Sequence, residues 1–235
     1  MNFTPVRTHI FKEGDDLPRF MVRYIPSIAE NTIVVVSSKL TGLWKKRTVP
    51  YQSKAQKEKL IKQESSAALK TPLAWLTIRE GMVMTNSGID ESNADGKLVL
   101  LPQNCFACAR ELRNALKPFW KVSNFGIIIT DSMILPLRAG VIGAAVGYDG
   151  FKGVKDLRGQ KDIFGKPLQT TLVDAADSLA AAAAVTMGEA AEKSPLCVVQ
   201  DAPVVFAEQT DPQEIKYPAE DDLYTPLLKA VKLIK

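Results

Sequence analysis

Gly126-Ile127-Ile128-Ile129-Thr130-Asp131-Ser132 joins an apolar, β-branched run to an acid and a hydroxyl. The run predicts a strand buried on both faces. Open α/β sheets place their chemistry at the carboxyl edge of such strands. We therefore expect Asp131 at that edge, where its carboxylate and the neighbouring hydroxyl of Ser132 can share one magnesium ion and its waters. The alternative is that Asp131 only caps a following turn.

A second acid, Asp90, lies in a polar segment, Asn86–Asn93 (NSGIDESN). Its composition alone also suits a plain surface turn. Two observations favour a binding loop instead. Ile89 can anchor the segment in the core directly before Asp90, and Asp90 with Asn93 can then offer a carboxylate and an amide to one ion or phosphate.

A third acid follows a predicted helix. Residues 174–187 (DAADSLAAAAAVTM) have apolar side chains at helical spacing, with Asp174 as the expected N-cap. Gly188 is a natural stop, so Glu189 is presented just past the helix end. Our hypothesis is that the three acids hold divalent metal ions against a nucleoside triphosphate.

Composition narrows the choice of metal and of partners. The chain of 235 residues can bury a large core as one domain or two joined ones, and its net charge of +4 makes nonspecific nucleic-acid binding a weak interpretation. One histidine and three cysteines make a zinc site hard to build, which leaves oxygen ligands and so Mg²⁺ or Mn²⁺. Few cysteines, no leader pattern in residues 1–16 and no 18-residue apolar stretch predict a cytoplasmic protein that does not enter a membrane. Cys105 and Cys108 are best interpreted as packing residues.

The remaining elements alternate along the chain. We expect a helix start at 14–17, a buried strand at 32–38, a polar helix at 53–69, a short strand at 98–101, a helix at 104–117, a strand at 196–199 and an amphipathic segment at 221–234. Glycines recur between 138 and 165, and neither familiar glycine-rich phosphate loop is present. The cations Arg138, Lys155, Arg158 and Lys161 in that segment suit an anionic substrate, or are scattered surface charges.

Several segments together resemble one family, the coenzyme F420-0:L-glutamate ligases, or γ-glutamyl ligases. The matching stretches are 12–17 (KEGDDL), 34–39 (VVVSSK), 86–93 (NSGIDESN), 127–132 (IIITDS), 136–140 (PLRAG), 159–165 (GQKDIFG), 176–180 (ADSLA) and 187–189 (MGE). The tail around 201–203 and 220–228 resembles a bacterial branch described as folate-metabolism γ-glutamate ligases. The resemblance implies an α+β fold over residues 1–235, with two intertwined α/β subdomains, in a homodimer.

The resemblance also implies a reaction and its cofactors. It implies GTP-dependent addition of L-glutamate, through an amide bond, to a carboxylate of F420-0 or a folate, with two divalent cations (Mg²⁺ or Mn²⁺) and a potassium ion. Carried over residue by residue, the metal ligands would be Asp90, Asp131, Ser132 and Glu189. The nucleotide would be bound by Ser38, Lys39, Asn93, Met187, Gly188, Glu189 and Ala190.

Two segments depart from the family pattern. Arg7-Thr8-His9 stands where the family has a Gly-Ile-Pro or Gly-Leu-Pro loop, and Gly42–Arg47 (GLWKKR) stands where it has Ser-Lys-Ala-Glu-Gly-Arg. The metal site is thus kept while contacts to the nucleotide or acceptor are rebuilt, which leaves room for a folate acceptor or for ATP.

The expected mechanism is γ-phosphoryl transfer to the acceptor carboxylate, giving an acyl phosphate that the glutamate amine attacks. The metal ions neutralise charge and position the phosphates. We assign catalytic roles to Asp131, Lys39 and Arg138, the last two as holders of phosphates or glutamate carboxylates. The alternatives are a catalytically inactive homologue that binds a nucleotide or pterin, and a metal-dependent phosphohydrolase.

Overall fold

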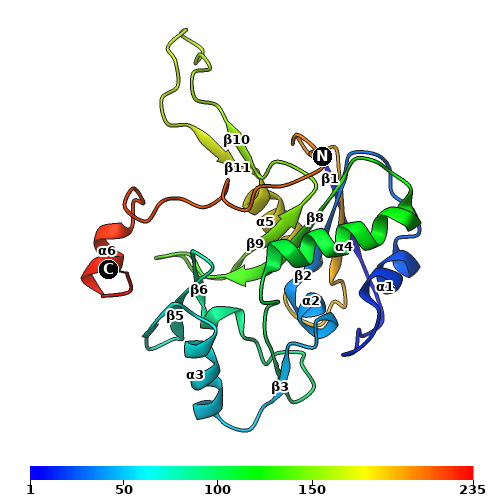
Figure 1. Cartoon of the computed structure of the whole chain (residues 1–235), viewed down its shortest axis with the longest axis vertical. Helices are drawn as coiled ribbons and strands as arrows, with labels where there is room; N and C mark the ends of the chain where they lie inside the picture. Colours follow the sequence, from blue (N-terminus) through cyan, green and yellow to red (C-terminus); the bar gives the residue numbers. More distant parts are fainter. Residues whose placement is uncertain (235) are drawn as a thin grey trace.

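A mixed five-stranded sheet forms the centre of the computed structural model, which describes residues 1–234 (Figure 1). Its strands, in spatial order, are β1 (Asn2–Val6), β12 (Leu196–Gln200), β2 (Thr32–Ser37), β8 (Phe125–Met133) and β9 (Ile142–Asp149). Only β2 and β8 run parallel, and the other neighbours are antiparallel. The strands predicted at 32–38 and 196–199 are confirmed within one residue.

Helices cover both faces of this sheet. On one face, Val34 and Val36 pack with α1 (Leu17–Tyr24) and α4 (Cys105–Trp120). On the other face, Ile33 and Val35 pack with the alanine-lined side of α5 (Ala175–Met187). Alternate residues of β2 therefore enter two different cores, which explains why the strand is apolar at successive positions.

Side-chain caps fix where the three helices begin. Asp16, Asn104 and Asp174 each accept a hydrogen bond from the backbone N–H three residues on. The predicted helix starts are thereby confirmed, including Asp174 as an N-cap. Helix α4 continues three residues past its predicted end, to Trp120, whose indole N–H donates to the Ile25 carbonyl.

A smaller unit lies between β2 and α4 in the sequence. It contains α2 (Ser38–Trp44), β3 (Thr48–Pro50), α3 (Lys54–Gln63), β4 (Ala67–Lys70), β5 (Trp75–Arg79), β6 (Met82–Thr85), η1 (Asn86–Gly88) and β7 (Lys97–Val99). The helix predicted over 53–69 was too long, because its last part is β4, which pairs with β5. The strand predicted at 98–101 is β7, shifted toward Lys97 and paired with β3.

A hairpin arm projects from the body after β9 (Figure 1). It is formed by β10 (Val154–Asp156) and β11 (Leu172–Asp174), with residues 157–171 as its end. Asp156 and Asp162 accept backbone N–H groups within this end, as expected for turn residues. Ile163 and Phe164 are 92% and 88% exposed, so the tip offers apolar surface to solvent.

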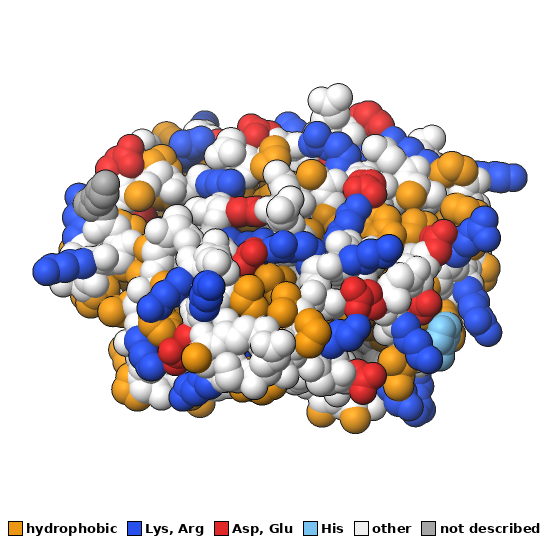
Figure 2. Space-filling model, turned by 60° about the horizontal axis from the view of Figure 1, so that its bottom comes forward, with side chains coloured by type: hydrophobic (Ala, Val, Ile, Leu, Met, Phe, Trp, Pro, Cys, Tyr) orange, Lys and Arg blue, Asp and Glu red, His pale blue; other side chains and the backbone are white. Residues whose placement is uncertain are grey.

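The C-terminal segment, predicted as an amphipathic segment over 221–234, is helical over a short stretch. Of residues 221–234, only α6 (Thr225–Ala230) forms a helix. Within residues 1–234 no helix has the length and apolarity that crossing a bilayer requires. Figure 2 shows basic and acidic side chains interspersed over one face of the molecule. The helices and several sheets agree with the α+β expectation, while the division into two subdomains stays a prediction.

Candidate functional site

Asp131 lies inside β8 rather than after its end, which corrects the sequence-based placement. Parallel pairing with β2 stops at Ser37 and Thr130, where α2 begins. Strand β8 continues to Met133 through antiparallel pairing with β9, in which Asp131 faces Ala144. Asp131 is therefore at the carboxyl edge of the parallel pair, held by a partner strand that the local sequence does not reveal. It is not the N-cap of a turn.

The environment of Asp131 opposes its ionisation. Burial, reinforced by the negative charge of Asp90, raises the pKa of Asp131 to about 6, although a hydrogen bond from Ser38 acts in the opposite direction. The Ser38 hydroxyl donates to Oδ1 of Asp131 at 2.9 Å. A carboxylate in such a place gains from a cation, because positive charge restores the ionised form.

A β-bulge in β9, at Val146, lies opposite the part of β8 just before Asp131. The register between β8 and β9 shifts between Ile129 and Thr130, and a bulge frees backbone groups and re-aims side chains. Asp177, from the first turn of α5, accepts the Ala145 N–H at 2.7 Å, opposite Thr130. Asp177 thus holds the bulge from the next layer.

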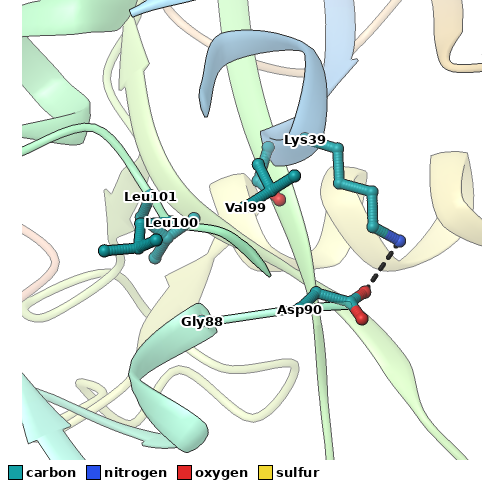
Figure 3. Close-up of a pocket in the computed structure, with 7 residues that line it drawn as sticks. Lys39, Gly88, Asp90, Val99, Leu100 and Leu101 are labelled. Carbon is teal, nitrogen blue, oxygen red and sulfur yellow. Dashed lines mark ion pairs between the residues drawn. The ribbon is translucent and has the colours of Figure 1, made fainter. Parts of the chain in front are cut away.

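Asp90 reaches the same place from the smaller unit. Ile89 is 3% exposed, which confirms that it anchors the segment, and Asp90 bridges to Val99 through backbone hydrogen bonds. Lys39 extends from α2 so that its Nζ lies 2.7 Å from Oδ2 of Asp90 (Figure 3). Burial opposes ionisation of Asp90, but hydrogen bonds from Lys39 and Ser92 outweigh it and lower its pKa.

A glycine lets the Asp90 segment approach β8. Gly88 has a φ of 69°, in the left-handed region, and a Cβ placed there would lie 2.4 Å from Cδ1 of Leu101 and 3.1 Å from Oδ2 of Asp131. Any larger residue would push the segment away from Asp131. The close approach explains how two carboxylates from separate units influence each other.

Glu189 lies where the sequence predicted, just after the end of α5. Helix α5 ends at Met187, and Gly188 turns the chain with a φ of 83°. The Ser132 hydroxyl donates to Oε2 of Glu189 at 2.8 Å, which joins this loop to β8. The Asn93 amide donates to the Ala190 carbonyl at 3.2 Å, which joins the loop to the Asp90 segment.

One cavity of about 990 Å³ unites these residues. Its lining includes every predicted metal-ligating or nucleotide-binding residue, namely Ser38, Lys39, Asp90, Asn93, Asp131, Ser132, Met187, Gly188, Glu189 and Ala190. Arg138 is not part of the lining, and it lies in the exposed segment between β8 and β9. The lining also includes Thr8–Phe11, to which sequence reasoning assigned no site residue, although it noted Thr8 and His9 within a departure from the family pattern.

The chemistry of the lining suits hard divalent cations. Carboxylate and hydroxyl oxygens are the ligands that Mg²⁺ and Mn²⁺ prefer, and the four predicted ligands supply only these. Within residues 1–234, no three His, Cys, Asp or Glu side chains are grouped as a ready-made metal site. Mg²⁺ is commonly held by one or two carboxylates together with substrate phosphates and water, so the donor set fits an ion that arrives with a phosphate.

The mixed sheet, Lys39 and the carboxylate and hydroxyl oxygens in the cavity lining together define a candidate site for metal ions and an anionic ligand. Comparison with known proteins shows the family to which a protein with this site belongs. Residues 5–201 match the family described as F420-0:Gamma-glutamyl ligase. The chain is 30% identical over 237 residues, and 94% of each chain, to a coenzyme F420:L-glutamate ligase of Archaeoglobus fulgidus. The protein belongs to the F420-0:γ-glutamyl ligase family.

Other relatives match over a shorter region. The chain is 42% identical over 143 residues to the coenzyme F420:L-glutamate ligase of Methanococcus maripaludis strain C7, which covers 61% of this chain and 57% of that protein. It therefore spans little more than half the length of this relative. The Methanosarcina barkeri protein of the same name is 29% identical over 93% of this chain and 92% of its own.

Proposed function

We propose that the protein is a nucleotide- and metal-dependent γ-glutamyl ligase, which joins the amine of L-glutamate to a carboxylate of a cofactor acceptor. The observation that carries the proposal is the meeting of Asp90, Asp131, Ser132 and Glu189 in one cavity. These residues come from three separate segments of the chain. Binding a small molecule would not by itself require so many acids, whereas a triphosphate brings the cations that such acids hold.

In the proposed reaction the four oxygen-bearing residues hold the metal ions. Asp90, Asp131, Ser132 and Glu189 would hold two divalent ions, Mg²⁺ or Mn²⁺, and a potassium ion is a further candidate. The bound ions would neutralise charge on the phosphates during γ-phosphoryl transfer. The acceptor carboxylate attacks the γ-phosphorus to form an acyl phosphate and releases the nucleoside diphosphate. The glutamate amine then attacks the acyl carbon, phosphate leaves, and the amine loses a proton.

Lys39 is placed to hold a phosphate. Its ammonium lies 2.7 Å from Asp90 and 2.9 Å from the Ser92 hydroxyl, with 28% of its side chain exposed. A cation so near the predicted ligands can pair with a phosphate oxygen once a metal ion takes over the charge of Asp90. Asn93 and the turn at 187–190, with Ser38, would line the nucleotide. Arg138 would bind a glutamate carboxylate from its exposed segment.

F420-0 is the first acceptor to test. The relatives that match are named coenzyme F420:L-glutamate ligases. GTP is the nucleotide that the family resemblance implies. A folate acceptor and ATP remain second choices because Arg7-Thr8-His9 and Gly42–Arg47 depart from the family pattern.

We also propose a cytoplasmic homodimer. The exposed apolar tip of the hairpin arm, at Ile163 and Phe164, supports association between copies, because a second copy that covers these side chains removes apolar surface from water. All three cysteines are buried and free, which suits a reducing compartment.

Mass spectrometry tests the reaction directly. The purified protein is incubated with Mg²⁺ or Mn²⁺, L-glutamate, GTP or ATP, and either F420-0 or tetrahydrofolate. We expect one acceptor to gain the mass of a glutamyl residue, with one phosphate released for each amide formed. Reactions without glutamate serve as controls. Nucleotide binding without phosphate release would contradict the proposal and favour an inactive homologue, and phosphate release that needs neither acceptor nor glutamate would favour a phosphohydrolase.

A further inference from the structure

The turn that precedes Asp90 has an uncommon backbone. Asn86, Ser87 and Gly88 follow one another with φ values of 51°, 55° and 69°, all in the left-handed region. Glycine adopts this region freely and asparagine tolerates it, whereas serine is strained there. Such strain persists only where the surrounding structure holds it, and it tends to lie at functional sites. The turn leads through Ile89 into Asp90, so a predicted metal ligand follows directly from a strained segment.

Ser87 is hydrogen-bonded at each of its polar groups. The residue is 0% exposed. Its backbone N–H donates to the Thr77 hydroxyl at 2.9 Å, its hydroxyl donates to the Glu64 carbonyl at 2.8 Å, and its carbonyl accepts from the Arg79 guanidinium at 3.3 Å. A buried polar group that loses its partner costs free energy, so these three bonds hold the strained conformation in place.

Arg79, the last residue of β5, ties this turn to a second segment. Its side chain is 7% exposed, and its guanidinium also donates to the Pro102 carbonyl at 2.7 Å and pairs with Glu64 at 3.2 Å. Arg47 adds a bond to Glu64 at 2.6 Å and another to the Leu101 carbonyl at 3.2 Å. The planar fork of a guanidinium suits acceptors that converge from different segments. The two arginines thereby fix the strained turn against the segment that precedes α4.

The contact between these two segments decides where Asp90 lies. Leu101 lies beside Gly88 in the small pocket that Asp90 also lines (Figure 3). A Cβ at Gly88 would approach both Leu101 and the carboxylate of Asp131, so the turn fits between them without spare room. The lining of the large cavity includes Asp90 and Asp131 but not Arg79. Arg79 therefore reaches the site through the turn and not by contact with a bound ligand.

We propose that Arg79 is a positioning residue for the metal site, because it locks the strained turn that holds Asp90 in place opposite Asp131. The inference rests on the proposed function, in which both carboxylates bind divalent ions. Partners that orient metal ligands matter to binding, and losing one typically weakens metal affinity by about 10- to 100-fold. The alternative is that Arg79 serves only the stability of the smaller unit, in which case its replacement lowers the unfolding temperature and leaves metal affinity unchanged.

A second buried arginine offers a matched control. The side chain of Arg113, in α4, is 2% exposed; it also pairs with a carboxylate, that of Asp149, and donates to a backbone carbonyl, that of Phe125, at 2.8 Å. Neither Arg113 nor Asp149 lines the cavity. Arg79→Lys and Arg113→Lys therefore remove the same planar fork, once behind the strained turn and once between α4 and the end of β9.

Mn²⁺ affinity is the measurement that separates the two roles. Mn²⁺ is titrated calorimetrically into each folded protein with a saturating non-hydrolysable analogue of GTP or of ATP, and unfolding temperatures are recorded without metal. We expect both lysine variants to unfold at a lower temperature, because each leaves buried acceptors unpaired. Arg79→Lys should weaken Mn²⁺ binding by about tenfold, and Arg79→Met, which removes every donor, by more. Arg113→Lys should keep the wild-type Mn²⁺ affinity.

A folded Arg79→Lys protein with the Mn²⁺ affinity of the wild type would overturn the inference. An equal loss of affinity in Arg79→Lys and Arg113→Lys would overturn it too, because the effect would then come from lowered stability alone. If neither Arg79 variant folds, Ser87→Ala carries the same titration. It removes only the hydrogen bond to the Glu64 carbonyl and should weaken Mn²⁺ binding by roughly threefold. An unchanged affinity in Ser87→Ala would then contradict the positioning role.

The titration also separates this inference from the proposed reaction, because it needs no product. A wild type that makes no glutamyl product overturns the reaction, yet weaker Mn²⁺ binding in Arg79→Lys still supports the positioning role. A wild type that makes the product, with an equal Mn²⁺ affinity in Arg79→Lys, overturns the positioning role and leaves the reaction standing. A wild type that binds no Mn²⁺ with either analogue overturns the positioning role as well, because it leaves no metal site to position.

Discussion

Two parts of the cavity lining, called here the acidic end (Asp90, Asp131, Ser132 and Glu189) and the His9 end (Thr8–Phe11), are built in different ways. At the acidic end, Asp131 and Ser132 stand on a buried strand, and Glu189 follows directly after a helix. At the other end, His9 stands on a segment without regular structure, held by a tyrosine hydroxyl and one backbone hydrogen bond. Rigid elements position groups more precisely than loops do, whereas loops accept sequence change more readily. The difference therefore lies in what holds the groups: regular elements position the acids, and a loop carries His9.

The largest effect should come from Asp131→Asn. The amide keeps an oxygen that can accept from Ser38, so we expect the variant to fold with little loss of stability. It cannot supply a charged ligand, and turnover should fall by on the order of 100-fold or more. Turnover at saturating Mg²⁺ and the unfolding temperature are the measurements. A folded variant with wild-type turnover would mean that Asp131 is not a metal ligand.

An intermediate effect is expected from Lys39→Met, which keeps most of the side-chain volume and removes the charge. Without the ammonium, both the pairing with Asp90 and the predicted phosphate contact are lost, so kcat/KM for the nucleotide should fall by roughly 10- to 100-fold. Lys70→Met is the control, because Lys70 also pairs with a carboxylate, that of Glu58, but lies outside the cavity lining. If the two variants behave alike, Lys39 has no special role in nucleotide binding.

The smallest effect is expected at Asp177, which accepts the Ala145 N–H and so supports the strands that carry Asp131. Burial and the negative charge of Asp174 raise the pKa of Asp177. The folded state therefore holds the Asp177 proton more tightly than the unfolded chain does. The stability that comes from this proton is complete below the unfolded pKa and is lost as pH rises through the folded pKa.

Asp177→Asn keeps an oxygen for the Ala145 N–H but cannot ionise, so its stability should not fall in this way. Relative to the variant, the wild type should lose stability between the ordinary carboxyl range and neutrality. Urea unfolding of both proteins at several pH values measures the difference. A difference in unfolding free energy that stays constant with pH would rule out a raised pKa at Asp177.

The sequence predicted much of the acidic end because its signals are local. The apolar run before Asp131, the N-cap Asp174, the stop at Gly188 and the anchor Ile89 each depend on a few neighbouring residues. The same reasoning placed a helix over 67–69, where a strand forms, because that strand depends on pairing with β5. Local patterns therefore predicted which helices and strands form more accurately than they predicted which strands pair with each other.

Features that need distant partners were missed. The continuation of β8 through Asp131 depends on β9, and the role of Asp177 depends on a bulge in another layer. His9 was used only to argue against zinc and to mark a departure from the family pattern, because its hydrogen bond with Tyr24, fifteen residues further along, depends on how the chain folds. The sequence did contain one signal for this contact. His9 lies in a segment that departs from the family pattern, and aromatic residues follow it at helical spacing.

Metal binding tests the central claim most directly. Mn²⁺ is titrated calorimetrically into the protein in the presence of a non-hydrolysable GTP analogue, and the wild type, Asp131→Asn and His9→Ala are compared. The account predicts that Asp131→Asn weakens Mn²⁺ binding by about tenfold or more, whereas His9→Ala leaves the Mn²⁺ affinity unchanged once the analogue is saturating. Mn²⁺ binding that is the same in Asp131→Asn and the wild type would contradict it.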